Sequence, residues 1–112
     1  MRYPKEIPVL RSGQVGRYAL TKRGGPYCAI GWFNYILQNT GDTPISTKLR
    51  KTYRKCAIAA GILNHGIMST NDGIRSPATR ALLVNAAFAA IGYVVGQDKK
   101  AVKLAKKAGY TV

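Results

Sequence analysis

Acidic residues are scarce in this chain, which has four of them against 18 lysines and arginines among its 112 residues. The formal net charge is therefore +14 when the single histidine is counted as neutral. So few scattered acids give little support to the paired carboxylates of metal-assisted nucleases or glycosidases. Most basic side chains have no acidic partner within the chain and must face water or an anionic partner. The acids are Glu6, Asp42, Asp72 and Asp98.

Soft metal ligands are equally few, since Cys28 and Cys56 are the only cysteines and His65 is the only histidine. A structural zinc site usually takes four such ligands, and the chain has no CxxC pair. The glycines form no phosphate-binding loop, because the segment from Gly13 to Gly16 lacks the lysine and Ser/Thr that should follow it. We therefore expect no metal, no nucleotide site and no cofactor.

One set of residues is compatible with catalysis. Cys28, His65 and Asn71 follow the order of nucleophile, base and orienting amide in papain-like enzymes. The local sequence typical of that family is absent, and its sites usually lie in a cleft between larger lobes. The simpler interpretation makes Cys28 a small buried hydrophobe and His65 a surface or capping residue. We expect no enzymatic activity and keep a thiol-dependent enzyme using Cys28 and His65 as an alternative.

Long hydrophobic runs are also missing. The longest stretch without charge, Ala81 to Gln97, is broken by Asn85 and Gly92 and is shorter than the roughly 20 apolar residues of a membrane-spanning helix. The stretch from Met1 to Pro8 holds prolines and charges where a signal peptide needs apolar residues. We expect a cytoplasmic protein with no membrane partner, whose uncharged stretch forms a buried central helix.

The chain does contain enough apolar sequence for a core, because 46% of its residues are hydrophobic and 20% are charged. These values are typical of globular proteins and argue against a disordered basic tail. A chain of this length is expected to form one domain. We predict a mainly α protein, with a compact bundle of about four helices over residues 26–112. A short N-terminal β-hairpin or an extended basic arm is expected over residues 1–25.

Capping residues and helical periodicity locate the predicted helices. Ser76 and Pro77 are typical of a helix start, Asp98 can cap a last helix, and Gly109 can end that helix. The predicted helices cover residues 27–38, 77–95 and 99–108, and a further helix is expected to start after a cap at Thr43 or Ser46 and to run to Leu63. A turn-rich connector is expected over residues 64–75.

The basic residues cluster in the N-terminal arm, the second helix and the last helix. In the second helix they crowd the first two turns, where positive charge opposes the helix dipole at a cost of roughly a few tenths of a kcal/mol per residue. Arginine pairs with phosphates, lysine adds diffuse attraction, and exposed tyrosine stacks on unpaired bases. The candidate binding residues are Arg17, Lys22, Arg23, Lys48, Arg50, Lys51, Arg54, Lys55, Lys99, Lys100, Lys103, Lys106 and Lys107. The interleaved tyrosines are Tyr3, Tyr18, Tyr27, Tyr53 and Tyr110.

Two short blocks occur together in the chain, a Cys-x-x-Gly block from Tyr27 to Gly31 and an Asn-Asp block at Asn71-Asp72 before an apolar helix. Together they resemble a family of small uncharacterised phage and bacterial proteins, a domain of unknown function with the same two features. The resemblance covers roughly residues 27–91. It implies a mostly helical fold and a phage or mobile-element origin, and it brings no known activity or catalytic residue.

We therefore predict a non-enzymatic, basic binding protein, which the resemblance implies to be phage-encoded. Its partner is expected to be nucleic acid, RNA or DNA, or a nucleic-acid-handling host complex such as a polymerase or ribosome. The alternative is a phage inhibitor that binds an acidic surface of a host protein directly, in the host cytoplasm. The first residues expected to make contact are Arg50, Lys51, Arg54 and Lys55.

Overall fold

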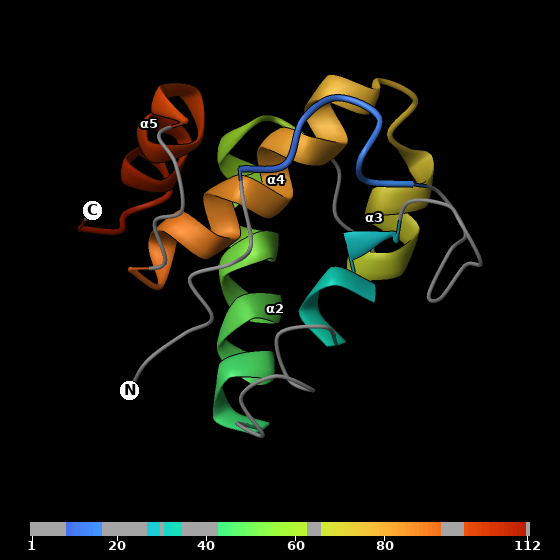
Figure 1. Ribbon diagram of the computed structural model, residues 1–112. Coiled ribbons are helices and arrows are strands. Elements are labelled where there is room, and N and C mark those ends of the chain that lie inside the picture. Colours follow the sequence, from blue (N-terminus) through green and yellow to red (C-terminus); the bar gives the residue numbers. More distant parts are fainter. Residues whose placement is uncertain are drawn as a thin grey trace.

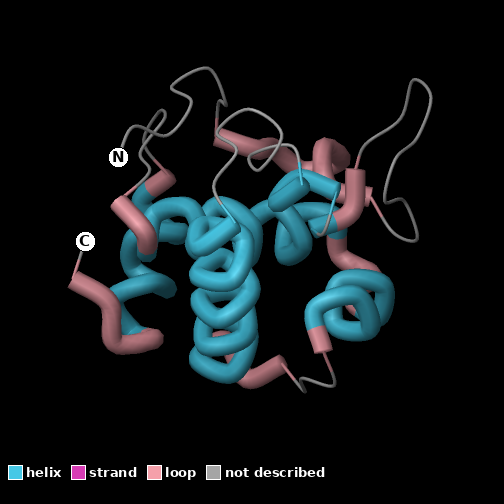
Figure 2. Tube along the Cα trace, turned by 90° about the horizontal axis from the view of Figure 1, so that it is seen from below, coloured by secondary structure: helices cyan, strands magenta, loops and turns pink. Residues whose placement is uncertain are grey.

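The computed structural model describes residues 9–16, 27–29, 31–34, 43–62, 66–92 and 98–111. Within these residues the protein is mainly helical and has no strand, which confirms the predicted fold class in its main point (Figure 1 and Figure 2). The helices are α2 (Thr43–Ala59), α3 (Ile67–Gly73), α4 (Pro77–Ala90) and α5 (Lys99–Lys107), and Ala29 and residues 31–34 are also helical.

Helix α4 is the central element of the fold and packs against both α2 and α5 (Figure 1). Nine of its 14 residues are buried, as expected for a helix that is apolar on nearly every side. The hydroxyl of Ser76 accepts a hydrogen bond from the backbone N–H of Thr79 at 3.3 Å, and Pro77 follows at the start of the helix. The predicted start of this helix is therefore confirmed.

An aromatic cluster joins α2, α4 and the helical residues 31–34. The ring of Phe33 meets the rings of Tyr53 and Phe88 edge to face, with centroids 5.8 Å and 5.9 Å apart. Leu49 of α2 and Leu83 of α4 are fully buried in the same core. Such edge-to-face pairs stabilise the core beyond the effect of the apolar area that they bury, and they orient the helices against each other.

Two predicted helices end earlier than expected, each just before a glycine with a left-handed backbone. Helix α2 stops at Ala59, before Gly61 (φ 76°), and does not reach Leu63. Helix α4 stops at Ala90, before Gly92 (φ 81°), although we expected it to continue to residue 95. Glycine adopts a positive φ without steric cost, and a residue with a positive φ ends an α-helix. Both helices therefore end near their glycine although the surrounding sequence is apolar.

The predicted turn-rich connector is partly wrong, because residues Ile67–Gly73 form helix α3. Serine, threonine, asparagine and aspartate are weak helix formers, which is why the sequence suggests turns there. The side chain of Asn71 is fully buried and bonds the backbone of two distant segments. These tertiary hydrogen bonds hold α3 in place and override the local preference.

The start of α5 agrees with the prediction. One carboxylate oxygen of Asp98 accepts hydrogen bonds from the backbone N–H groups of Lys100 and Ala101, both at 3.1 Å. At the other end, the backbone N–H of Tyr110 bonds the carbonyl of Ala105 at 3.0 Å, across Gly109. This is the glycine-terminated helix end that the sequence predicts.

Residues 9–16 run across α4 and are tied into the core (Figure 1). Leu10 and Val15 are buried, and the stretch contains turns and no strand, so the predicted hairpin has no support there. The rest of the predicted arm, residues 1–8 and 17–26, lies outside the described residues. Four side chains form hydrogen bonds with the backbone of residues 9–16. Asn85 bonds the backbone of Leu10, and Trp32 donates to the carbonyl of Gln14. Arg80 donates to the carbonyl of Val15, and Asn71 donates to the carbonyl of Gly16.

Candidate functional site

The exposed side of α2 carries a dense group of cations. The apolar repeat of this helix turns Leu49, Tyr53 and Cys56 into the core, so the remaining positions face solvent. Ile58 lies one turn beyond Arg54 on this exposed side and is 65% exposed. The exposed cations of α2 are Lys48, Arg50, Lys51, Arg54 and Lys55.

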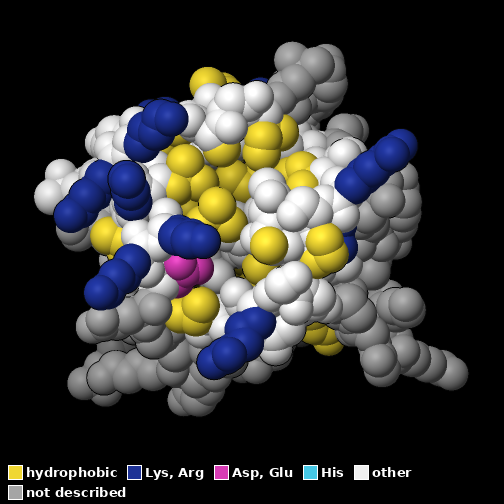
Figure 3. All heavy atoms as spheres, turned by 90° about the horizontal axis from the view of Figure 1, so that it is seen from above, with side chains coloured by type: hydrophobic (Ala, Val, Ile, Leu, Met, Phe, Trp, Pro, Cys, Tyr) yellow, Lys and Arg dark blue, Asp and Glu magenta, His cyan; other side chains and the backbone are white. Residues whose placement is uncertain are grey.

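Helix α5 has the same organisation on a shorter length. Ala101, Leu104 and Ala105 are buried against the rest of the protein, and the intervening lysines are exposed. Seen from above, Lys and Arg side chains gather over α5, beside an apolar area of the surface (Figure 3). The exposed lysines of α5 are Lys99, Lys100, Lys103, Lys106 and Lys107.

The structure brings these two groups together at one junction. The ammonium nitrogen of Lys55 lies over the ring of Tyr110, 5.6 Å from its centroid. Helices α2 and α5 are in contact, and Tyr110 lies three residues after Lys107, the last residue of α5. An exposed cation–π contact of this kind contributes roughly 0.5–1 kcal/mol. We call the exposed cations of both helices, with Tyr110 between them, the α2–α5 surface.

Tyr110 is half-buried at this junction. Burial raises the pKa of its phenol, and the nearby Cys56 thiol is the second cause. The phenol therefore stays neutral around pH 7 and can donate a hydrogen bond. The ring offers an apolar face and a polar edge within a strongly cationic region.

The described acids are too few to balance this surface. Residues 43–62 and 98–111 place five cations on α2 and five on α5, whereas the whole described part of the chain holds two acids, Asp72 and Asp98. The carboxylate of Asp98 accepts hydrogen bonds from the backbone N–H groups of Lys100 and Ala101 and from the side-chain amide of Asn85, each at 3.1 Å. Asp72 accepts a hydrogen bond from Asn71 at 3.2 Å. The α2–α5 surface is therefore strongly positive.

Other candidates are placed differently. Arg17, Lys22 and Arg23 lie outside the described residues, as do Tyr3 and Tyr18. Two further exposed arginines, Arg11 and Arg75, lie on neither α2 nor α5 and are not among the candidate binding residues, although Arg11 belongs to the basic residues of the predicted arm.

The prediction that Tyr53 belongs to the aromatic part of the binding surface is wrong. Its side chain is fully buried, because it lies on the apolar side of α2 against Phe33. Tyr27 is half-buried and meets Trp32 edge to face at 5.5 Å, so its ring already has an aromatic partner. Of the described tyrosines, Tyr110 is the one that lies beside the cations.

Buried polar residues were largely missed by the sequence reasoning. Arg80 is 8% exposed, and its guanidinium donates to the carbonyls of Val15 and Ile74, both at 2.7 Å, and of Arg75 at 3.2 Å. A basic residue in the first turns of an otherwise apolar helix was the available signal. Arg80 therefore acts as a structural cation and does not belong to the exposed set.

The residues of the catalytic alternative are only partly described. Cys28 is 2% exposed, in agreement with a small buried hydrophobe. The amide of Asn71 accepts from the backbone N–H of Ala29 at 3.3 Å and donates to the Gly16 carbonyl at 2.8 Å, so it holds backbone segments together. His65 lies outside the described residues. No group of three potential metal ligands occurs in the part of the chain that is described.

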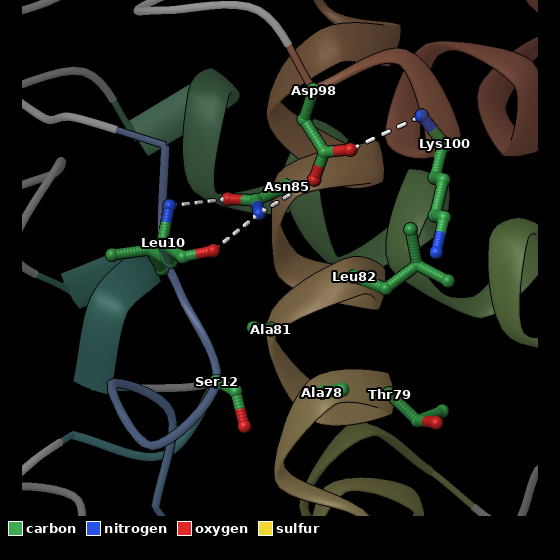
Figure 4. Close-up of a pocket in the computed structure, with 9 residues that line it drawn as sticks. All are labelled: Leu10, Ser12, Ala78, Thr79, Ala81, Leu82, Asn85, Asp98 and Lys100. Carbon is green, nitrogen blue, oxygen red and sulfur yellow. Dashed lines mark hydrogen bonds between the residues drawn. The ribbon is translucent and has the colours of Figure 1, made fainter.

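A shallow pocket of about 330 Å³ lies between residues 9–16, α4 and the start of α5 (Figure 4). Ala78, Ala81 and Leu82 form its apolar side, and Asn85 and Asp98 lie at its polar end. The polar atoms of these two side chains already bond Leu10, each other and the α5 backbone. The other polar residues that line the pocket are Ser12, Thr79 and Lys100.

Comparison of the chain with protein-family models, curated proteins and solved structures found no match. The resemblance to a small phage and bacterial family thus stays a prediction. In the described residues, no helix is both long enough and apolar enough to span a membrane.

Proposed function

We propose that this protein is a non-enzymatic binding protein that engages nucleic acid, alone or within a nucleic-acid-handling complex, through the α2–α5 surface. The observation that carries the proposal is the Lys55–Tyr110 contact, which joins two strongly cationic helices. Adjacent rows of exposed Lys and Arg are the electrostatic feature that phosphate backbones require. A phage origin, with action in a host cytoplasm, belongs to the same proposal.

Helix geometry supports several simultaneous phosphate contacts. With a rise of about 1.5 Å per residue, Lys48 and Lys55 lie about 10 Å apart along α2, and Lys99 and Lys107 about 12 Å apart along α5. A nucleic-acid strand that lies along either helix would therefore pass several cations in succession. Contacts of this kind go to phosphates and carry no sequence information, so we expect binding with little sequence preference.

Salt dependence tests the proposal. The affinity for a labelled oligonucleotide should fall by orders of magnitude between about 50 and 200 mM salt if several phosphates are contacted. The double variant Lys51→Gln/Lys55→Gln should weaken binding and reduce the salt slope by about two. The matched control is Arg11→Gln/Arg75→Gln, which removes the same charge from exposed positions outside α2 and α5. Equal effects of the two double variants would contradict the α2–α5 surface as the binding site.

The competing hypothesis is an inhibitor that binds an acidic host protein. Absence of oligonucleotide binding even at about 50 mM salt would overturn the nucleic-acid proposal. Capture from a bacterial lysate with and without nuclease then separates the two classes. A partner retained after nuclease treatment and lost in Lys51→Gln/Lys55→Gln supports direct protein binding.

A further inference from the structure

The Lys55–Tyr110 contact also indicates which form of nucleic acid fits the α2–α5 surface. Lys55 is an exposed residue, and its ammonium lies over one face of the Tyr110 ring. That face is therefore turned toward the cationic surface, and the group that lies over it is the end of a long, flexible side chain. A second flat group can take the place of the ammonium without any movement of the backbone.

The other described aromatic residues make their ring contacts elsewhere in the fold. Phe33, Tyr53 and Phe88 are buried in the core cluster. Tyr27 and Trp32 pack on each other, and the indole N–H of Trp32 bonds the Gln14 carbonyl at 2.9 Å. Within the described residues, Tyr110 is thus the aromatic side chain that the α2–α5 surface presents.

We infer, on the basis of the proposed function, that the α2–α5 surface binds single-stranded nucleic acid, with an unpaired base stacked on Tyr110. In a duplex the faces of internal bases are covered by their neighbours, so phosphate contacts alone remain. In a single strand a base can stack on a tyrosine while the flanking phosphates pair with cations. Aromatic rings set among cations are the common arrangement of proteins that bind single strands without sequence preference.

Lys55 has two roles in this inference. In the free protein its ammonium covers the ring of Tyr110. When a base occupies the ring, the ammonium is free to pair with a phosphate of the same strand, so the charge is used in both states. Ile58, exposed one turn beyond Arg54 and Lys55, provides an apolar contact for a sugar or base at the edge of this position.

The test compares single-stranded DNA, single-stranded RNA and duplex DNA, each of about 20 nucleotides per strand and without self-complementarity, a length above typical single-strand site sizes. Binding is measured by fluorescence anisotropy for the natural chain, Tyr110→Phe and Tyr110→Leu. Phenylalanine keeps the ring, whereas leucine keeps apolar contact with the helix end and removes the ring. Circular dichroism and thermal unfolding verify that each variant is folded.

We expect tighter binding of single strands than of duplex, retained in Tyr110→Phe. In Tyr110→Leu, affinity for single strands should fall about 10-fold, with duplex affinity and salt slope unchanged. Equal affinity for single strand and duplex, or an equal loss on both in Tyr110→Leu, overturns this inference and leaves the proposed function intact. No binding of any oligonucleotide overturns both. The DNA and RNA arms show which single strand is preferred.

Discussion

The side-chain amide of Asn85 forms hydrogen bonds with both backbone groups of Leu10. Its oxygen accepts from the Leu10 N–H at 2.9 Å, and its nitrogen donates to the Leu10 carbonyl at 2.7 Å. The same nitrogen donates to Asp98 at 3.1 Å. One buried asparagine thereby connects the N-terminal segment, the central helix and the start of α5, which is the helix that carries half of the cations of the α2–α5 surface.

Asn85→Ala is expected to lower the free energy of unfolding by roughly 2 to 4 kcal/mol, because it leaves the buried N–H and carbonyl of Leu10 without partners. Asn85→Asp should cost at least as much near pH 7, since a carboxylate would face the Leu10 carbonyl and Asp98. Urea unfolding measures both. A loss below 1 kcal/mol for both variants would contradict the connecting role of Asn85.

Asp98→Ala is expected to destabilise the protein by about 1 to 3 kcal/mol, because Asp98 accepts from two backbone N–H groups of α5 and from Asn85. Asp98→Asn should cost less, since asparagine is also a good capping residue. Ser76→Ala provides a comparison of about 1 kcal/mol, as Ser76 accepts a single backbone hydrogen bond. Thermal or urea unfolding should show a larger loss of stability for Asp98→Ala than for Asp98→Asn or Ser76→Ala. A smaller loss for Asp98→Ala than for Ser76→Ala would contradict this prediction.

Tyr53→Phe is expected to leave the unfolding free energy unchanged or raise it by up to about 1 kcal/mol. The hydroxyl of Tyr53 is buried without a hydrogen-bond partner among the described residues, and burial raises its pKa. Phenylalanine keeps the edge-to-face contact with Phe33 and removes the unsatisfied group. A loss of more than 1 kcal/mol in urea unfolding would mean that the hydroxyl makes a stabilising contact.

Stability is expected to fall as the pH rises from 9 to 11. Burial raises the pKa of the Cys56 thiol from 9.0 to about 11, so the unfolded chain loses this proton first. The unfolded state then binds fewer protons than the folded state, and the unfolding free energy falls by up to about 1.4 kcal/mol per pH unit. The contribution of Cys56 is fully present below pH 9 and is lost by pH 11. Cys56→Ala should show a shallower fall between pH 9 and 10, and an identical slope would contradict the assignment.

Much of the helical architecture could be predicted from short stretches of sequence. Ser76 and Asp98 cap their helices as expected, and Gly109 ends α5 as expected. Capping and periodicity involve residues within one or two turns of each other, so a linear sequence contains the whole signal. The early ends of α2 and α4 at Gly61 and Gly92 show that a single glycine outweighs a continuing apolar pattern.

The sequence predicts which cations belong to the candidate site and does not predict how the two helices bring them together. The cations of α2 and α5 are exposed as the apolar repeats indicate, but the sequence placed them in separate groups. Tyr53 satisfies two patterns, an apolar repeat and an interleaved aromatic, and the sequence could not decide between them. In the structure Phe33 packs against the ring of Tyr53 in the core, so Tyr53 belongs to the apolar repeat.

The excess of positive charge, its concentration on two helices and the helical class can thus be read from the amino-acid sequence, because these depend on composition and on neighbours along one helix. Two further features come from the packing of the helices: buried Asn85, Arg80 and Asn71 hold residues 9–16, and Lys55 meets Tyr110. Asn85 and Leu10 are 75 positions apart. Contacts over such separations depend on how whole helices pack, and no local pattern encodes them.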